Sequence, residues 1–180
     1  MPGRTPAEAH RAFVEPLEAA VACLGLAKIT FSNGGAYNVH KDHAWNLGRL
    51  GAGMVFPGGY CFRAAMKYRF VPHETGWRVT TLEYIYSLSV ADEVLWAMHW
   101  HPVGDSHETR PHLHMAIPGA GGARAHRPVP RMTFEEAVEW VIESGIDPAR
   151  DDWMDVLTKS KQLHVLHRTW HGDSGQPDES

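Results

Sequence analysis

The sequence has few cysteines, no long apolar run and no large excess of charge of either sign. Its two cysteines, Cys23 and Cys61, are too few to staple a chain of 180 residues or to form an all-cysteine zinc site. The longest uncharged apolar stretch, residues 19–27, falls far short of the roughly 20 residues of a membrane-spanning helix. The N-terminus carries charges where a signal peptide has its apolar segment. These absences predict a cytoplasmic protein that does not cross a membrane.

The charge balance and the motifs exclude further classes. With 17 basic and 21 acidic residues the formal net charge is -4, whereas a protein that coats DNA carries a large positive excess. An RNA enzyme with a local basic patch stays compatible with this balance. The GxGxxG and Walker loops, the GxSxG nucleophile motif and the HExxH zinc motif are missing from the sequence. We expect residues 1–180 to form a single domain, with flexible ends at 1–5 and 172–180.

The hydrophobic pattern predicts an α+β fold. Apolar residues recur every three to four positions over residues 6–24, which is typical of a helix. Residues 28–32 favour a short strand, and an alternation of period two predicts four more strands, over 64–71, 77–90, 93–101 and 112–117. A capping box at Thr133 opens a C-terminal helix, and another is expected near Asp151. The expected architecture is one antiparallel sheet of about four to five strands, an N-terminal helix and one or two C-terminal helices.

Two segments have no sustained period. Residues 33–59 and 119–131 are rich in glycine or proline and are predicted to be loops, although so long a loop as the first is either functional or contains a short element. The run HKDH at 40–43 is interpreted as part of that polar loop. Residues 161–170 fit a helix or a strand equally well.

Histidine is the unusual residue type, with 13 in the chain. The sharpest feature is His99-Trp100-His101, followed after a short loop by His112-Leu113-His114. Since residues i and i+2 of a strand share a face, each pair of imidazoles points the same way. If the two strands form a hairpin, all four lie on one face, with His99 near His114 and His101 near His112. Directly opposed Cβ atoms would then be roughly 4.5–5.5 Å apart.

Two chemistries would use such a cluster. In the first, three imidazoles, with Glu108 or Asp105 as a further ligand, hold a divalent metal ion such as Zn, Mn or Fe and leave a position for water. In the second, a neutral histidine takes a proton from a nucleophile and a protonated one donates to the leaving group, as cleavage of RNA requires. Arg110, with Lys67 and Arg69, would then stabilise the phosphate.

Other histidines and tyrosines favour structural interpretations. His164, His167 and His171 would share one face of a helix, which we expect to be exposed. Tyr84 and Tyr86 share a strand face with apolar neighbours and are expected in the core. Histidines on the wet face of a hairpin need no function, so this alternative stays open for the two pairs as well.

The middle of the chain resembles a group of known proteins. A tyrosine-rich strand (YIY, 84–86) precedes HWHP, a short loop, PHLH and a helix that opens TFEEAV. This order resembles a set of small bacterial proteins that share HWHP and PHLH, and more distantly the TumE-like toxin components of toxin–antitoxin pairs. The matching positions are His101, Pro102, Pro111, His112, His114 and 133–136. The resemblance implies RNA cleavage as the activity and a cognate antitoxin protein as a partner.

These observations lead to one main hypothesis and two alternatives. The main hypothesis is a small cytoplasmic ribonuclease, acting as a toxin component. In it, His99, His101, His112 and His114 serve acid–base or metal roles, and Arg110 stabilises the phosphate. The first alternative is a cupin-like metal-binding enzyme that acts on a small molecule, and the second is a non-enzymatic binding module.

Overall fold

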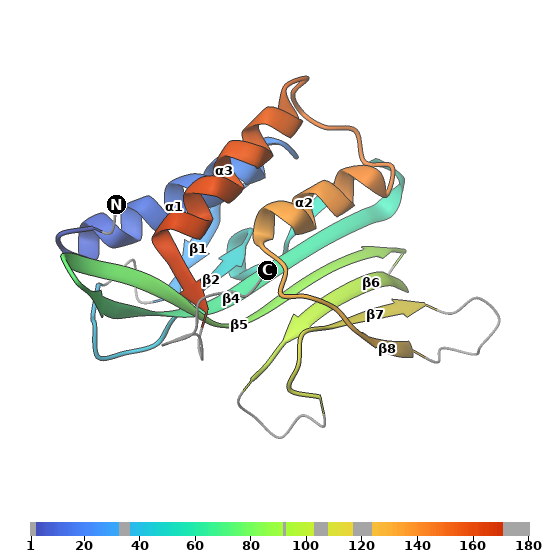
Figure 1. Ribbon diagram of the computed structural model, residues 1–180. Helices are drawn as coiled ribbons and strands as arrows, with labels where there is room; N and C mark the ends of the chain where they lie inside the picture. Colours follow the sequence, from blue (N-terminus) through green and yellow to red (C-terminus); the bar gives the residue numbers. More distant parts are fainter. Residues whose placement is uncertain (1–2, 33–36, 92, 103–107, 117–123, 171–180) are drawn as a thin grey trace.

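Helices cover one face of a large twisted sheet in the computed structural model of the chain (Figure 1). The structure describes residues 3–32, 37–91, 93–102, 108–116 and 124–170, with the backbone alone for 116, 124–126 and 166–168. The helices are α1 (Pro6–Ala22), α2 (Phe134–Glu143) and α3 (Trp153–His167). The strands are β1 (Ile29–Phe31), β2 (His43–Leu47), β3 (Met54–Phe56), β4 (Tyr60–His73), β5 (Gly76–Val90), β6 (Glu93–Trp100), β7 (His112–Ala116), β8 (Arg124–Pro128) and β9 (Arg168–Trp170).

This arrangement confirms the α+β class, the N-terminal helix and two C-terminal helices. Over the described ranges the sheet has nine strands, more than the four to five expected, in the order β1-β2-β4-β5-β6-β7-β8. Neighbours along this path are antiparallel, and β3 pairs with the beginning of β4. The short β9 runs parallel to β5 at Val79–Thr81, beyond the point at which pairing with β6 ends. In the part of the chain that is described, no helix is long and apolar enough to span a membrane.

The extra strands come from segments without hydrophobic periodicity. The predicted loop 33–59 contains β2, β3 and two short 3-10 turns, and the predicted loop 119–131 contains β8. β2 and β8 have five residues each and β3 has three, too few for an alternation to stand out among glycines and prolines. The ambiguous segment 161–170 is helix up to His167 and strand from Arg168 onward.

Capping boxes begin the first two helices. The Thr133 hydroxyl accepts a hydrogen bond from the Glu136 amide, while the Glu136 carboxylate accepts one from the Thr133 amide. Thr5 and Glu8 do the same at the start of α1. These bonds satisfy backbone donors that a helix N-terminus otherwise leaves unpaired.

The core lies between the sheet and the helices. Alternate strand residues such as Trp45, Tyr86 and Met98 are fully buried on the side of the helices. The Phe134 ring of α2 packs edge-on against Trp45 at a centroid distance of 5.2 Å. Tyr84 and Tyr86 belong to this core, as expected, with rings stacked 4.8 Å apart. The intervening side chains of these strands point to the opposite face of the sheet.

Two histidines lie in the interior instead of on the surface. His164, expected on an exposed helical face, has an exposed fraction of 1% and its Nδ1 lies 2.7 Å from a carboxylate oxygen of Glu135 in α2. The side chain of His167 and all of residue 171 lie outside the described residues. His43, expected in a polar loop, opens β2 and is also buried. In both cases the ring has a polar partner, Glu135 for His164 and the carbonyl of Asn38 for His43, which lowers the cost of burying it. No sequence pattern indicates these partners.

Candidate metal centre

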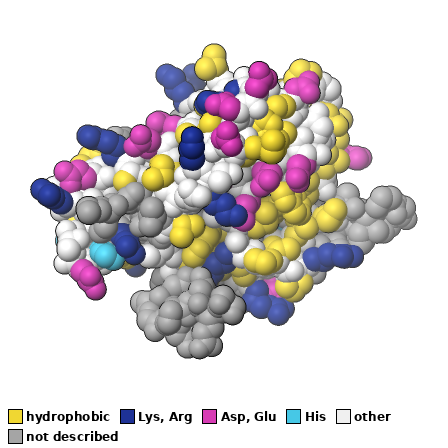
Figure 2. Space-filling model, turned by 45° about the horizontal axis from the view of Figure 1, so that its top comes forward, with side chains coloured by type: hydrophobic (Ala, Val, Ile, Leu, Met, Phe, Trp, Pro, Cys, Tyr) yellow, Lys and Arg dark blue, Asp and Glu magenta, His cyan; other side chains and the backbone are white. Residues whose placement is uncertain are grey.

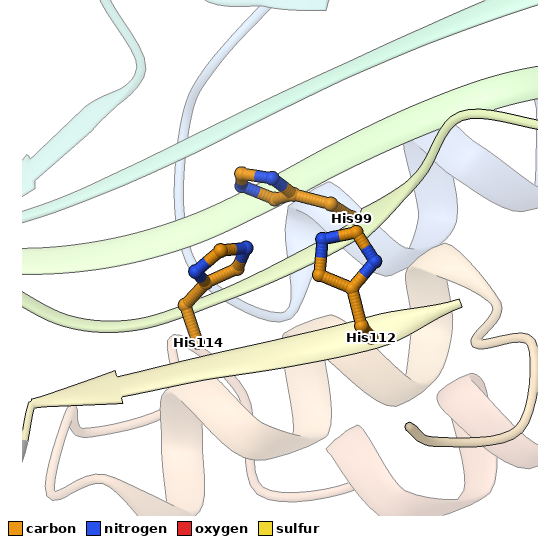
Figure 3. Close-up of side chains that lie close together, drawn as sticks. All are labelled: His99, His112 and His114. Atoms are coloured by element: carbon orange, nitrogen blue, oxygen red, sulfur yellow. The ribbon is translucent and has the colours of Figure 1, made fainter. Parts of the chain in front are cut away.

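Three histidines converge on the face of the sheet that points away from the helices. His99 lies on β6, and His112 and His114 lie on β7. Met98, directly before His99, and Leu113, between His112 and His114, are buried in the core. Figure 3 shows the three rings directed toward one another from the two neighbouring strands. On each strand, the residues that pack in the core and the histidines therefore lie on opposite faces of the sheet.

The three rings lie close enough together to share one ligand. One potential ligand nitrogen from each of His99, His112 and His114 lies within 4.8 Å of the other two. Their ring centroids are 4.6 Å apart for His99 and His114, 4.8 Å for His112 and His114, and 5.6 Å for His99 and His112. Such a group can surround a single small cation.

The strand register differs from the expected one. His112 lies directly opposite His99, and His114 lies opposite Ala97, so the pairing is shifted by two residues. The observed register puts Leu113 opposite Met98 on the buried face. A shift of two residues leaves every side chain on the same face, and for this reason the alternation alone could not distinguish the two registers.

His101 follows the end of β6 and lies beside the cluster. Its ring centroid is 5.5 Å from that of His99, and it is not among the three that converge. Burial lowers the pKa of His101; Glu83 opposes this effect, and His112 and Lys67 act in the same direction as burial. The imidazole of His101 is consequently neutral at pH 7 and suited to accept a proton.

A backbone contact orients His112. Its Nδ1 lies 2.8 Å from the carbonyl oxygen of Arg110. Since a carbonyl can only accept, Nδ1 carries the proton, and the lone pair of the neutral ring is on Nε2. This arrangement, with one imidazole nitrogen donating to a carbonyl and the other carrying a lone pair, is typical of metal-binding histidines.

The ring nitrogens of this centre are largely removed from solvent. His112 has an exposed fraction of 3%, both ring nitrogens of His114 are buried, and His99 is partly accessible. The buried position restricts the rings to few orientations. The accessible side of the centre is the side of His99.

The residue types fit a divalent transition metal. Imidazole suits Zn and Fe, with Zn–N bonds of about 2.0–2.1 Å, so tetrahedral ligand nitrogens are roughly 3.4 Å apart. Small rotations of the three rings would close the separations of up to 4.8 Å. Of the two carboxylates predicted as further ligands, Asp105 lies outside the described residues and Glu108 is bound to Arg110. Three protein ligands leave a coordination position for water or substrate.

The three predicted phosphate-binding cations are all engaged in ion pairs. Arg110 binds Glu108 at 2.9 Å, Lys67 binds Glu83 at 2.7 Å, and Arg69 binds Asp42 at 2.6 Å. The hydrogen bonds from Arg110 lower the pKa of Glu108 to about 2. Lys67 shares the sheet face of the histidines and lies nearest to His101, whose pKa it affects.

Two concavities differ in their relation to the histidines. A hollow of about 150 Å³ on the open face of the sheet is lined by residues that include His101, Lys67 and Glu83. A larger groove of about 770 Å³, between α2 and α3, has no histidine in its lining. It belongs to the helical face seen in Figure 2, where hydrophobic and acidic side chains gather. The chemistry therefore favours the smaller hollow.

Sequence reasoning did not identify two polar residues of this hollow, Asn46 and Glu83. Asn46 comes from a strand that the sequence did not reveal, and Glu83 is an ordinary strand position with no motif around it. Only the strand pairing brings them beside His101.

Comparisons with protein-family models, with curated proteins and with solved structures found no match to this chain.

Proposed function

We propose that the protein is a metal-dependent enzyme that cleaves phosphodiester bonds in RNA. The observation that carries this proposal is the convergence of His99, His112 and His114, with ligand atoms within 4.8 Å of one another. A divalent cation bound there would polarise a phosphate oxygen or a nucleophile. The neighbouring His101, whose pKa burial lowers, adds a proton acceptor on the same face.

Each residue of the site has its own role in the proposed reaction. The three converging imidazoles fix the position of the cation, and His112 is held by the Arg110 carbonyl. During cleavage the nucleophile oxygen, from water or the ribose 2′-hydroxyl, bonds to phosphorus while the ester P–O bond breaks. His101 accepts the proton that the nucleophile loses, and the leaving oxygen takes up a proton from solvent.

Metal binding is preferred to metal-free acid–base catalysis on geometric grounds. An acid–base pair needs two groups on opposite sides of the phosphate, whereas these three nitrogens surround one point. The contact of His112 Nδ1 with the Arg110 carbonyl leaves Nε2 as the ligand atom, and this orientation, with the burial of His114, suits ligands better than proton shuttles. The toxin role and the antitoxin partner stay predictions that rest on the resemblance alone.

Metal content is the direct test. Purified protein is depleted of metal, dialysed against Zn, Mn or Fe in turn, and analysed by elemental mass spectrometry. We expect one metal ion per chain for the wild type and a large loss for His99→Gln and His112→Gln. His40→Gln is the matched control, because His40 is exposed and lies outside the cluster. Circular dichroism verifies that each variant is folded.

Activity is tested on a labelled oligoribonucleotide and on a DNA of the same sequence. We expect the RNA to be cleaved. EDTA should abolish this cleavage, and addition of the metal that the protein binds should restore it. Cleavage that survives EDTA but disappears in a His112→Ala/His114→Ala double variant would favour metal-free catalysis. Stoichiometric metal without cleavage of RNA would favour the cupin-like alternative, and neither metal nor cleavage would support the non-enzymatic one.

A further inference from the structure

The hollow on the open face of the sheet has a flat apolar floor. Three neighbouring strands contribute small or aliphatic side chains to it: Ala44 from β2, Ala65 from β4 and Ile85 from β5. Ala65 lies directly opposite Ile85 in the β4–β5 pairing. Ala44 and Ala65, diagonal neighbours in the β2–β4 pairing, leave a depression where larger side chains would fill the face. Its volume of about 150 Å³ is smaller than that of whole-ligand sites, which are roughly 300–1,000 Å³. It therefore accommodates one ring system of a larger molecule.

The rim of this hollow is polar and offers both donors and acceptors. Asn46, next to Ala65 in the β2–β4 register, carries an amide that donates and accepts. On another side stand Lys67 and Glu83, a donor and an acceptor joined by an ion pair of 2.7 Å. His101 completes the rim. A flat apolar floor with mixed donors and acceptors around it matches a heterocyclic base, whose faces are apolar and whose edge alternates donors and acceptors.

The hollow adjoins the three-histidine centre. Ile85 of its floor lies directly opposite His99 in the β5–β6 pairing, so their Cβ atoms are about 5 Å apart. His101 lines the hollow and is a ring neighbour of His99. A base seated on Ala65 and Ile85 would thus place its ribose and phosphate toward the accessible side of the centre.

From this juxtaposition we propose that the hollow formed by Ala44, Asn46, Ala65, Lys67, Glu83 and Ile85 is a nucleobase subsite, which seats the base beside the scissile phosphate. The inference rests on the proposed function and names its substrate as a nucleotide unit with an unstacked base. Single-stranded RNA presents such bases, whereas a duplex hides them in its stack.

The test compares three probes that all contain a phosphate, of which only the first carries a base. Adenosine 5′-monophosphate, ribose 5-phosphate and inorganic phosphate are titrated into the metal-loaded and the metal-depleted protein by calorimetry, and amide shifts in β4 and β5 are followed by NMR. We expect the adenosine nucleotide to bind at least about tenfold more tightly than ribose 5-phosphate, because only the nucleotide has a base to seat on the apolar floor.

Ala65→Leu fills the floor of the hollow without touching a histidine. We expect it to reduce affinity for the adenosine nucleotide about tenfold, to leave phosphate affinity unchanged and to leave metal stoichiometry at the wild-type value. Val71→Leu is the matched control, since it enlarges an apolar side chain elsewhere on β4. It should change none of the three quantities.

The outcomes separate the subsite from the metal centre. Equal affinities for the adenosine nucleotide and ribose 5-phosphate, or no effect of Ala65→Leu, would overturn the subsite even if one metal ion binds per chain. Absence of metal binding, with the base preference and its loss in Ala65→Leu intact, would overturn the metal centre and retain the subsite.

Discussion

His112 donates its Nδ1 proton to the carbonyl oxygen of Arg110, 2.8 Å away and two residues earlier in the chain. The contact comes from the backbone, so it does not depend on the Arg110 side chain, which is exposed and bound to Glu108. The strand that carries the ligand therefore also supplies the group that orients it. Partners of this kind typically change metal affinity by 10–100-fold when they are lost.

Replacement of the Arg110 side chain should separate the role of its backbone carbonyl, which orients His112, from the role predicted for its guanidinium, which is to stabilise the phosphate. We expect Arg110→Ala to leave metal affinity within about threefold of the wild type, because the carbonyl that orients His112 stays in place. If Arg110 stabilises the phosphate, as the sequence predicts, the same variant lowers kcat without loss of metal. Competition with a chromophoric chelator measures the affinity, and a loss of more than tenfold would contradict the backbone role.

Bound metal should stabilise the fold. At a free metal concentration 100 times the Kd, a site present only in the folded state adds about 2.7 kcal/mol. For a chain of this size, 1 kcal/mol corresponds to a shift in Tm of about 2–4 °C, so we expect a rise of roughly 5–10 °C. Differential scanning fluorimetry of the metal-depleted protein with added Zn measures it. His99→Gln should show no rise, and His40→Gln should show the full one.

The pH dependence of activity should identify His101 as the proton acceptor. Burial lowers the pKa of His101 from its ordinary value of 6.5, so the imidazole stays neutral, and able to accept a proton, below that pH. We expect kcat to be constant near pH 7 and to fall only as the pH drops through this lowered pKa. In His101→Gln we expect a reduction of about 10²–10⁴-fold and the loss of this limb. An unchanged limb in the variant would assign the titration to another group.

Acid should destabilise the protein through His10. This ring is buried beside Phe31 and Tyr37, with centroid distances of 4.9 and 5.1 Å, and burial, with the charge of His43 second, lowers its pKa to about 4. Between pH 6.5 and 4 the unfolded chain takes up a proton at this position and the folded chain does not. The free energy of unfolding therefore falls with falling pH, by about 3 kcal/mol over that range.

His10→Phe should remove this contribution. Urea unfolding at pH 7, 6, 5 and 4.5 measures the free energy, and we expect a flatter profile for the variant than for the wild type. His40→Phe, at an exposed position, should keep the wild-type slope. Identical slopes for wild type and His10→Phe would show that other groups dominate acid unfolding.

The buried contact between Glu135 and His164 should be important for stability. Both side chains are 1% exposed, and Nδ1 of His164 lies 2.7 and 2.8 Å from the two carboxylate oxygens. His164→Leu removes a buried hydrogen bond from the carboxylate, and we expect a loss of about 3–5 kcal/mol. In Glu135→Leu/His164→Leu the buried carboxylate is gone as well, so the double variant should recover part of that loss. Additive losses in this cycle would mean that the two residues do not interact.

The sequence predicted the fold where periodicity is strong and failed where it is weak. The helix at residues 6–24 and the long strands of the sheet have regular apolar spacing, and the structure has these elements with bounds changed by a few residues. β2 and β8 have five residues each, and only their pairing with β4 and β7 stabilises them as strands. Such tertiary stabilisation is not visible in local spacing.

The candidate site could be predicted in part. The alternation in HWH and HLH is sufficient to put His99, His112 and His114 on one face. The pairing of His112 with His99 could not be derived, because a register shift of two residues preserves both faces. The burial of His164 could not be derived either, because its partner Glu135 is 29 positions away in the sequence.

The alternation along β6 gives the two sides of the sheet different tolerance to substitution. Trp96, Met98 and Trp100 are buried in the core, whereas His99 points to the open face and is only partly buried. Substitutions on the open face can therefore change the reaction while the fold stays intact. A deletion of one residue within β6 would have the opposite character: it would exchange the two sides, bring imidazoles against Phe134 and α2, and abolish folding and activity together.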